Sequence, residues 1–471
     1  MEQNHIDHDL PSILERWKIS KLARRQSSEP LFDIMETPIL PSVLSSSSTS
    51  NSFFNSSYRT PEKDRGSGTH PTGMAIPPEY TDNSLKRTAE ETSIITSFGK
   101  LNIKKKTIEA SIPWSGEALT AFQQLLMVCR QSAPVTLAEV FSSYCVKKLG
   151  EGTYGEAYRA GRTVCKVVPF DGDLLVNGET QKRSEEVLEE VLLSLTLNNL
   201  RSDRGDNEKE HSCDGFIETK DFRVCQGPYD PSLISAWEDY DAKRGSENDH
   251  PKDFTSEQCY IVFVLADGGT DLEGFAFVDY NEASSLLVQV TASLAVAESA
   301  CEFEHRDLHW GNILLAQDET PDTNQATSFT LQGKRMHART FGVNVSIIDF
   351  TLSRINTGDA ILFLDLSADP ALFQGKKGDK QAETYRRMKE ITQECWEGSF
   401  PKTNVVWLIY LVDMVLQKMK SLNIGTKVDR ELRSFKKRLA SYESARDCLA
   451  DPFFSDLLLD EGAQLSPMPP L

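Results

Sequence analysis

The sequence predicts an α+β fold with two lobes, a smaller lobe rich in strands and a larger lobe that is mainly helical. Up to about residue 266 the ordered segments are mostly of strand type, and from residue 282 onward they are mostly helical. A glycine-rich turn between two strand-type segments adds a hairpin to the first lobe. Strands that precede helices in this way are typical of α+β proteins. We expect the smaller lobe over about 111–266 and the larger lobe over about 267–471.

The first 110 residues differ in composition from the rest of the chain. They contain 27 Ser and Thr residues and few clustered apolar residues. Such a segment cannot bury enough surface to offset the chain entropy that is lost on folding. We therefore expect a disordered Ser/Thr-rich regulatory arm over 1–110 and an ordered domain over 111–471. Ser27 follows two arginines, and Thr37 and Thr60 each precede a proline, so regulatory kinases are expected to act on this arm.

The charge of the chain is concentrated in the ordered domain. The chain holds 51 Lys and Arg against 70 Asp and Glu, and residues 1–110 hold 14 of each sign, so the net charge of −19 belongs to 111–471. An acidic domain favours cationic partners and repels nucleic acid. We expect a basic partner and no direct sequence-specific binding of nucleic acid.

Composition also excludes several classes of protein. The longest apolar run, 405–412, is far shorter than the roughly 20 residues that a bilayer requires, and the first residues lack the features of a signal peptide. No membrane association is therefore expected. Nine cysteines without a Cys-x-x-Cys pair indicate reduced thiols in the cytosol or nucleus rather than disulfides or a zinc site.

The ordered elements of the first lobe follow from hydrophobic spacing. Apolar residues at helical spacing predict a short amphipathic helix over 116–130. Strand patterns follow at 146–149 and 162–168, on either side of the glycine-rich turn. A helix with one apolar face is expected over 184–197, and a buried strand over 260–265.

The second lobe is expected to be built on helices. A long Ala-rich helix covers 283–301, and short strands interrupt the helical pattern at 313–315 and 345–348. The segment over 201–256 is charged and expected to be loop-rich, and a polar insertion is expected around 317–341.

The glycine-rich turn has the sequence Gly-Glu-Gly-Thr-Tyr-Gly over residues 150–155. Glycine allows tight turns and lets backbone N–H groups approach phosphate oxygens. A dinucleotide-binding turn runs from a strand into a helix, whereas here a second strand follows. A glycine loop inside a hairpin is the nucleotide-covering flap of a protein kinase. The pattern therefore predicts nucleotide contacts at Gly150, Glu151, Gly152 and Gly155.

A single lysine, Lys166, stands in the apolar strand after this turn. A charge in such a strand must be neutralised. In a kinase its partners are the α- and β-phosphates and a glutamate on the following helix. Glu190 is the candidate, chosen from the neighbouring Glu185, Glu186 and Glu189 by helix face and order.

The strongest chemical signal lies at residues 304–312, Glu-His-Arg-Asp-Leu-His-Trp-Gly-Asn, which match the kinase catalytic loop. Asp307 can accept the proton of an attacking hydroxyl, and Asn312, five residues later, can hold a Mg²⁺ ion. A β-branched strand then ends at Asp349, the place of the metal-binding aspartate in Asp-Phe-Gly. Thr351 replaces the glycine of that motif.

Two departures from the usual pattern leave alternatives open. No Ala-Pro-Glu follows Asp349, so the usual activation segment is absent or rebuilt. His309 stands where most Ser/Thr kinases have Lys, and the run around it also resembles small-molecule kinases of the aminoglycoside and choline type. Arg306 and the glycine flap favour a protein kinase. A pseudokinase scaffold is a weaker alternative, because every catalytic position is filled.

Over about residues 140–450 the chain resembles haspin, a family of atypical eukaryotic protein kinases. The hinge departs from the family, since Ala266 and Asp267 stand where a glutamate and an aromatic residue are usual. The similar strings are Leu174-Leu175-Val176-Asn177-Gly178 with Gln181-Lys182, Thr291 to Glu298, Glu304 to Asn312, Ser346 to Asp349, Thr351-Leu352-Ser353-Arg354, Leu372-Phe373 with Tyr385-Arg386, and Asn404-Val405 with Trp407-Leu408.

This resemblance implies a bilobal eukaryotic protein-kinase-like fold and a serine/threonine kinase that uses ATP and Mg²⁺. It implies a catalytic set of Lys166, Glu190, Asp307 and Asn312, metal ligands at Asn312 and Asp349, and nucleotide contacts that include Lys166, Asn312, Asp349 and Asp271.

The resemblance also implies a substrate and a place of action. The family phosphorylates the threonine at the third position of histone H3 in mitosis, which would bring Aurora-kinase complexes to centromeres. The implied partners are the histone H3 tail and the nucleosome, and the implied location is the nucleus, on mitotic chromosomes. Acidic residues in the region where kinases bind peptide are expected to face that basic tail, namely Asp359, Asp365, Asp369 and, just past the hinge, Glu273.

Overall fold

A computed structural model describes five stretches of the chain: residues 119–202, 209–318, 325–358, 360–420 and 426–461. Several sequence-based predictions lie outside these residues. They are the regulatory arm with Ser27, Thr37 and Thr60, the first residues of the helix expected over 116–130, and Asp359.

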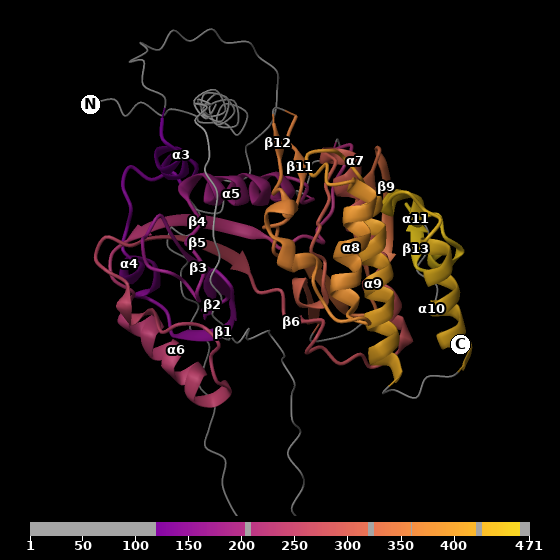
Figure 1. Cartoon of the computed structure of the whole chain (residues 1–471). Coiled ribbons are helices and arrows are strands. Elements are labelled where there is room, and N and C mark those ends of the chain that lie inside the picture. The colour runs from indigo at the N-terminus through magenta and orange to yellow at the C-terminus, as the bar shows by residue number, and fades with distance from the viewer. Residues whose placement is uncertain (1–118, 203–208, 319–324, 359, 421–425, 462–471) are drawn as a thin grey trace, which may run out of the picture. The chain divides into compact units, whose positions relative to one another are not determined.

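The smaller lobe is built on a five-stranded antiparallel sheet in the order β1-β2-β3-β5-β4 (Figure 1). The hairpin predicted around the glycine-rich turn is present, and Gly152 pairs with Gly155 across it. The sheet thus presents the glycine turn at the tip of its first two strands. The strands are β1 Val146–Gly152, β2 Gly155–Ala160, β3 Thr163–Phe170, β4 Thr219–Gln226 and β5 Cys259–Ala266.

Helices cover both faces of this sheet. Successive residues of a strand point to opposite faces, so Val167 packs with the core under α4 and α6, while Val168 packs with the core that includes α3 and α5. The helix expected over 184–197 is confirmed as α5. The helices of this lobe are α3 Ala121–Val128, α4 Leu137–Phe141, α5 Ser184–Asn198 and α6 Pro231–Arg244.

Two predictions for this lobe need correction. The first helix is shorter than expected, because a capping box at Thr120 and Gln123 fixes its start, and it ends at Val128. The stretch 201–256 is not simply loop, since it contains the edge strand β4 and the helix α6. Only three residues of α6 are buried, so its apolar pattern is weak.

The larger lobe is organised around two buried helices, α7 and α9. α7 is long and apolar enough to cross a bilayer by length and composition, but 83% of its apolar window is buried inside the structure, as in a core helix. The helices are α7 Tyr280–Cys301, α8 Lys380–Thr392, α9 Lys402–Met419, α10 Thr426–Leu439 and α11 Ala445–Cys448, with 3₁₀ turns at Trp310–Asn312, Leu366–Ala368, Pro370–Phe373 and Pro452–Phe454; a further 3₁₀ turn, Pro251–Asp253, precedes β5 in the smaller lobe.

Small sheets complete the larger lobe. The two short strands expected near 313–315 and 345–348 are present as β7 and β10, which pair with each other. The polar insertion expected around 317–341 contains the hairpin of β8 and β9. The strands are β6 Thr270–Asp271, β7 Ile313–Gln317, β8 Ala326–Leu331, β9 Lys334–Arg339, β10 Val343–Ile347, β11 Ile355–Asn356, β12 Ile361–Leu362 and β13 Leu458–Asp460.

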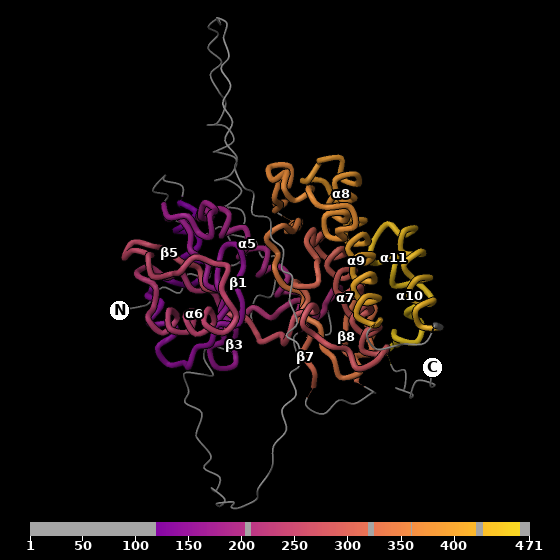
Figure 2. Tube along the Cα trace, turned by 60° about the horizontal axis from the view of Figure 1, so that its bottom comes forward, coloured from indigo at the N-terminus to yellow at the C-terminus, as the bar shows by residue number. Residues whose placement is uncertain are grey.

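The lobes are joined by contacts close to the catalytic motifs. The backbone N–H of Ile217, ahead of β4, donates to the carbonyl of Ile347 at the end of β10, at 3.0 Å. The ring of Phe216 meets Phe303 and Phe350 edge-on. The two views agree that α10 and α11 lie on the side of the larger lobe away from the five-stranded sheet (Figures 1 and 2).

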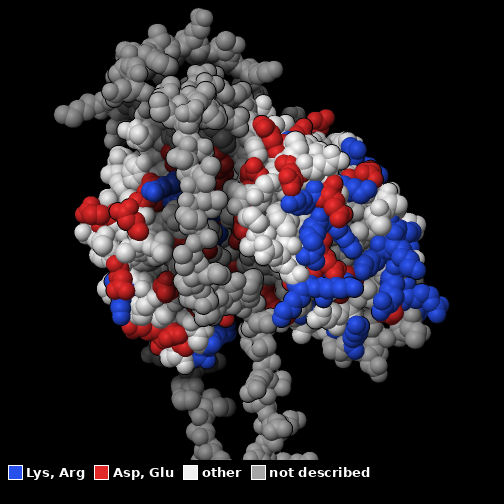
Figure 3. Space-filling model, in the orientation of Figure 1, with Lys and Arg blue, Asp and Glu red and all other residues white. Residues whose placement is uncertain are grey.

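A cluster of basic side chains stands out on the visible face (Figure 3). Lys and Arg gather at the end of the larger lobe, where α10 exposes Lys427, Arg430, Arg433 and Lys437.

Candidate active site

The glycine flap is held by its own strands and by close packing at one glycine. A Cβ at Gly155 would lie 2.4 Å from the carbonyl oxygen of Val167, so this position requires glycine. A Cβ at Gly150 would meet no atom within 4 Å, and one at Gly152 only the carbonyl oxygen of Gly155, at 3.9 Å. The open space beside these two glycines fits the approach of a phosphate to the backbone.

Hydrogen bonds from two segments, one after α6 and one after β3, hold the flap in place. The Asn248 side-chain amide donates to the carbonyl of Gly152 at 3.1 Å, and the Asn177 amide donates to the carbonyl of Thr153 at 2.9 Å. The Glu151 carboxylate accepts from Lys148 at 2.7 Å and from the backbone N–H of Glu247 at 2.9 Å. The Glu151 side chain is therefore oriented toward the segment after α6, which leaves only its backbone for the nucleotide contact that the sequence predicts.

Lys166, Glu190 and Asp349 come together from three elements. The ammonium nitrogen of Lys166 on β3 lies 3.1 Å from Oε1 of Glu190 on α5 and 3.9 Å from Oδ2 of Asp349. Burial opposes the charge of Lys166, but the carboxylates of Asp349 and Glu190 outweigh it and raise the pKa. The choice of Glu190 as the helix partner agrees with this ion pair. The lysine is held charged, as phosphate binding requires.

A second lysine, Lys182, shares the same glutamate, which sequence reasoning did not anticipate. Its ammonium nitrogen lies 2.6 Å from Oε2 of Glu190 and 3.5 Å from Oγ1 of Thr351. It also lies 5.3 Å from the ring centre of Tyr154 at the flap tip. Burial favours the neutral acid at Glu190, but Lys166 and Lys182 outweigh it and lower its pKa. In the sequence, the only signal for a role of Lys182 was that Gln181-Lys182 belongs to one of the strings that resemble the haspin family.

Asp307 and Asn312 lie side by side at the catalytic loop. The Asn312 side-chain nitrogen donates to the carbonyl of Asp307 at 2.8 Å and to its Oδ2 at 3.3 Å. Burial, with the nearby charge of Asp349, raises the pKa of Asp307 to about 8, although hydrogen bonds from Tyr385 and Asn312 oppose the shift. A raised carboxyl pKa near neutrality suits a group that must take up a proton.

The residues expected to hold Mg²⁺ fit that ion chemically. Burial alone would raise the pKa of Asp349, but Lys166, Lys182 and hydrogen bonds from Thr351 lower it well below its usual range, so the carboxylate stays ionised. The backbone N–H of Ile348 donates to the carbonyl of Asn312 at 3.0 Å, which places the two candidate ligands on paired chains. Mg²⁺ prefers a few carboxylate and amide oxygens and takes its other ligands from phosphate and water.

The loop that contains Asp349 is closely packed. Asp349 has a left-handed backbone, with φ of +59°, and its Oδ1 accepts the N–H of Thr351 at 3.2 Å. The Phe350 ring is buried against Phe216, Phe303 and His305. Aromatic packing on three sides and a β-branched residue at 351 both oppose rotation of this loop.

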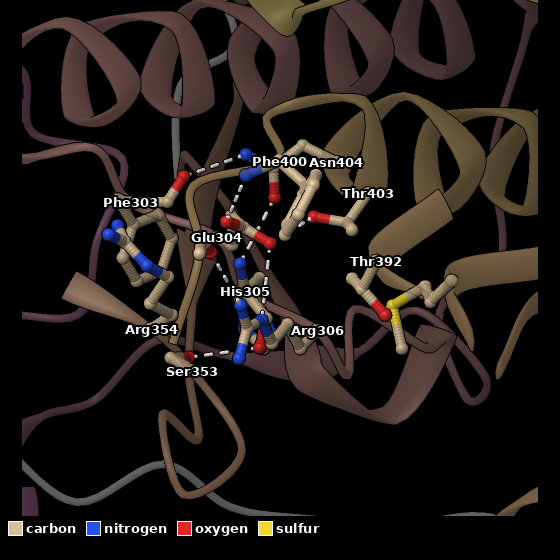
Figure 4. Close-up of polar contacts among 12 residues, drawn as sticks. Phe303, Glu304, His305, Arg306, Ser353, Arg354, Thr392, Phe400, Thr403 and Asn404 are labelled. Carbon is tan, nitrogen blue, oxygen red and sulfur yellow. Dashed lines mark hydrogen bonds and ion pairs between the residues drawn. The ribbon is translucent and has the colours of Figure 1, made fainter. Parts of the chain in front are cut away.

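Buried polar contacts fix the catalytic loop from beneath (Figure 4). The fully buried Arg306 guanidinium donates from Nε to the Glu304 carboxylate at 3.2 Å and stacks over the ring of Trp396. Glu304 also accepts from the Thr403 hydroxyl at 2.8 Å and from the backbone N–H of Phe400 at 2.6 Å. In many kinases an arginine is ordered by a phosphate on the activation loop. Here a carboxylate of the same chain supplies that charge.

We therefore expect kinase activity without phosphorylation of the domain. Residues 111–471, made in bacteria and treated with a phosphatase, should phosphorylate substrate at the same rate as untreated enzyme, because Glu304 already neutralises Arg306. The measurement is the initial rate before and after treatment, with mass spectrometry to confirm that no phosphate remains. A requirement for an upstream kinase acting on this fragment would contradict the prediction.

The two aspartates of the hinge region, Asp271 and Asp267, have different partners. Asp271 ends β6, which pairs with β7 directly after Asn312, and its Oδ1 accepts the N–H of Gly274 at 2.6 Å. Asp267 forms an ion pair of 2.7 Å with Arg159 of β2. A hollow of about 620 Å³ lies beside this pair. The unusual acidic residue of the hinge is thus neutralised by the flap strand.

The acids expected to face a peptide have local roles as well. Asp365 and Asp369 each begin a 3₁₀ turn and accept a backbone N–H, from Ser367 and Ala371 respectively, at 3.0 Å. Burial and the charge of Asp271 raise the pKa of Glu273, which Lys418 opposes. A capping aspartate keeps its negative charge and can still attract a cation.

Comparisons with known proteins agree with this arrangement. A family model described as the haspin-like kinase domain matches residues 13–450. A serine/threonine-protein kinase haspin homolog of Arabidopsis thaliana is 50% identical over 462 residues, which cover 96% of this chain and 75% of that protein. The haspin kinase of Bos taurus is 38% identical over 387 residues, covering 76% and 48%, and the Drosophila melanogaster homolog is 35% identical over 347 residues, covering 69% and 59%. The chain thus spans only about half the length of these two animal relatives.

Proposed function

Because the chain belongs to the haspin-like kinase family and is a serine/threonine protein kinase, we propose that it transfers the γ-phosphate of ATP to a threonine near the N-terminus of histone H3. The observation that carries the proposal is the convergence of Lys166, Glu190 and Asp349 beside Asp307 and Asn312. These are the side chains that phosphoryl transfer needs for positioning and charge neutralisation.

Each residue has a distinct part in the proposed reaction. Lys166, held by Glu190, would bind the α- and β-phosphates, and the carboxylate of Asp349 with the amide oxygen of Asn312 would hold Mg²⁺. When bound, that ion supplies neutralisation of phosphate charge. Asp307 orients the substrate hydroxyl and takes its proton as the oxygen attacks the γ-phosphorus. The phosphorus–oxygen bond to the β-phosphate breaks, and ADP leaves.

The alternatives from the sequence are less well supported. A small-molecule kinase of the aminoglycoside or choline type shares the run around His309, but the similar proteins are protein kinases. A pseudokinase scaffold is disfavoured because Lys166, Asp307 and Asp349 are all present and are brought to one site.

Charge supports a basic peptide as the substrate. The domain carries the whole excess of 19 acidic residues, and Asp271, Glu273, Asp365 and Asp369 lie on the segments that flank the catalytic loop. An unmodified histone H3 tail offers a free amine, an arginine and a lysine around its target threonine. Carboxylates that pair with these cations discriminate between substrates more strongly when the pairs are desolvated.

We expect neutralisation of the tail to weaken catalysis. Acetylating the tail amine, or replacing either adjacent basic residue by a neutral one, should lower kcat/KM. The corresponding loss of transition-state stabilisation should be about 1–3 kcal/mol for each change, as for hydrogen bonds to charged groups. Activity on the unmodified peptide should also fall steeply with salt. The measurement is kcat/KM for these peptides, with an acidic threonine peptide and small alcohols offered in parallel.

A pair of enzyme variants sharpens this test. Asp369→Asn keeps an oxygen that can cap the 3₁₀ turn but removes the charge. It should therefore reduce the difference in kcat/KM between the free and the acetylated tail. Asp239→Asn, on an exposed position of α6, should leave that difference unchanged. Equal turnover of acidic and basic peptides at low and high salt would refute the histone proposal.

We further propose that the protein acts in the nucleus, on mitotic chromosomes, through the nucleosome rather than through sequence-specific contacts with DNA. Phosphorylated tails would then bring Aurora-kinase complexes to centromeres, and kinases acting on the arm at Ser27, Thr37 or Thr60 would regulate the enzyme. This proposal rests on family membership. Loss of histone-tail phosphorylation in mitotic cells that lack the protein would support it, and unchanged phosphorylation would overturn it.

A further inference from the structure

The helix α8 stands in the chain where an Ala-Pro-Glu activation segment is missing, and one of its side chains reaches the catalytic loop. We propose that Tyr385 is a positioning residue that holds the carboxylate of Asp307 in the orientation needed to receive the substrate hydroxyl. The inference rests on the proposed role of Asp307 as the base, and the experiment below separates the two.

Both oxygens of the Asp307 carboxylate are engaged by different elements. The Tyr385 hydroxyl on α8 donates a hydrogen bond to Oδ1. The Asn312 amide on the catalytic loop donates to Oδ2 at 3.3 Å. A carboxylate held at both oxygens cannot rotate about its terminal bond without breaking one of these contacts. Tyr385, together with Asn312, therefore fixes the plane of the Asp307 carboxylate.

The tyrosine itself is held rigidly. Its side chain is buried, with 4% of the residue exposed, and its ring meets the Trp407 ring of α9 edge-on, with centroids 5.4 Å apart. The indole nitrogen of Trp407 contacts the sulfur of Met388, one turn along α8, at 3.1 Å. Burial and the neighbouring Asp307 raise the pKa of Tyr385 far above its usual value. The hydroxyl accordingly stays protonated and acts as a donor.

The simpler explanation is that Tyr385 only fills the core between α8 and α9. Another tyrosine of this protein shows what a core role looks like. Tyr260 on β5 is fully buried, yet its hydroxyl has no hydrogen-bond partner among the described residues. Burial alone therefore does not explain the contact of Tyr385 with Asp307. Tyr260 provides a matched control, because its replacement by Phe removes an equally buried hydroxyl far from the catalytic loop.

The test is a double-mutant cycle in the full chain. Tyr385→Phe keeps the ring and its packing on Trp407 and removes only the donor. We expect kcat to fall about 10- to 100-fold, as for loss of a hydrogen bond to a charged group, while the KM for ATP and the dissociation constant for nucleotide stay within about two-fold. Tyr260→Phe should leave all three unchanged.

The same substitution is then made in an Asp307→Asn background. If Tyr385 acts through Asp307, its removal should lower kcat much less there, because the group that it positions is already disabled. Any loss of folded protein caused by Tyr385→Phe lowers the rate by the same factor in both backgrounds, so it cancels when the two fold-changes are compared, and thermal melting monitors it directly.

Two results would overturn the proposal. One is a kcat for Tyr385→Phe within about two-fold of the wild-type value, and the other is an equal fall in both backgrounds, which would assign the effect to the fold. Failure of the base assignment has a different signature, since Asp307→Asn by itself would then retain the wild-type rate.

Discussion

Asp349→Ala should abolish phosphoryl transfer. The carboxylate is the only negatively charged ligand that we assign to Mg²⁺, and without it the phosphate charge would lack its counterion. The substitution also leaves Lys166, now 3.9 Å from Asp349, paired only with Glu190. The measurement is single-turnover transfer at saturating Mg²⁺ and ATP.

The matched control is Asp239→Ala, which removes an aspartate whose side chain is 75% exposed on α6. That variant should retain the wild-type rate. Nucleotide affinity measured without metal distinguishes loss of the ligand from loss of the fold, because the flap and Lys166 remain. Transfer by Asp349→Ala at a rate comparable with the control would rule out the metal assignment.

Asp307→Asn should lower kcat by several powers of ten while ATP binding survives. General-base catalysis contributes about 10²- to 10⁴-fold, and the amide has nearly the shape of the carboxylate but cannot take the proton. The amide oxygen can still accept from Tyr385, so the loop should keep its position. We would measure kcat by steady-state assay and nucleotide affinity by calorimetry.

For Asp307→Asn the comparison of the two quantities is decisive. A large fall in kcat with unchanged nucleotide affinity supports the base, since Asp307 lies on the catalytic loop and not on the flap or hinge. A rate near that of the wild type would show that the catalytic-loop assignment is wrong, whatever the affinity.

Sequence patterns predicted the parts of the structure that depend on residue spacing within one or two neighbouring elements. The hairpin of β1 and β2 followed from a glycine turn between two strand patterns, and α5 from its apolar face. Lys166 and Glu190 were matched by strand and helix face, and they form an ion pair in the structure. These features depend on spacing within one or two elements, which a sequence records directly.

The features that the sequence did not reveal depend on tertiary contacts. α6 has only three buried residues, and charged residues interrupt the buried positions of β4, so the sequence predicted a loop-rich stretch over 201–256. The hairpin of β8 and β9 was likewise hidden in a polar insertion. Lys182 and Tyr385 reach the site from 16 and 78 residues away from Lys166 and Asp307, and no local period encodes such a meeting.

The tether of the glycine flap bears on how inhibitors can bind this kinase. The carbonyls of Gly152 and Thr153 are held by Asn248 and Asn177, so the flap tip is anchored from outside the nucleotide site. A rigid heterocycle that already matches the pocket gains from such pre-organisation, because little loop entropy is lost on binding. Flexible compounds that depend on the flap folding over them gain nothing from it. Selectivity over kinases with untethered flaps would therefore come from the shape of the scaffold rather than from induced fit.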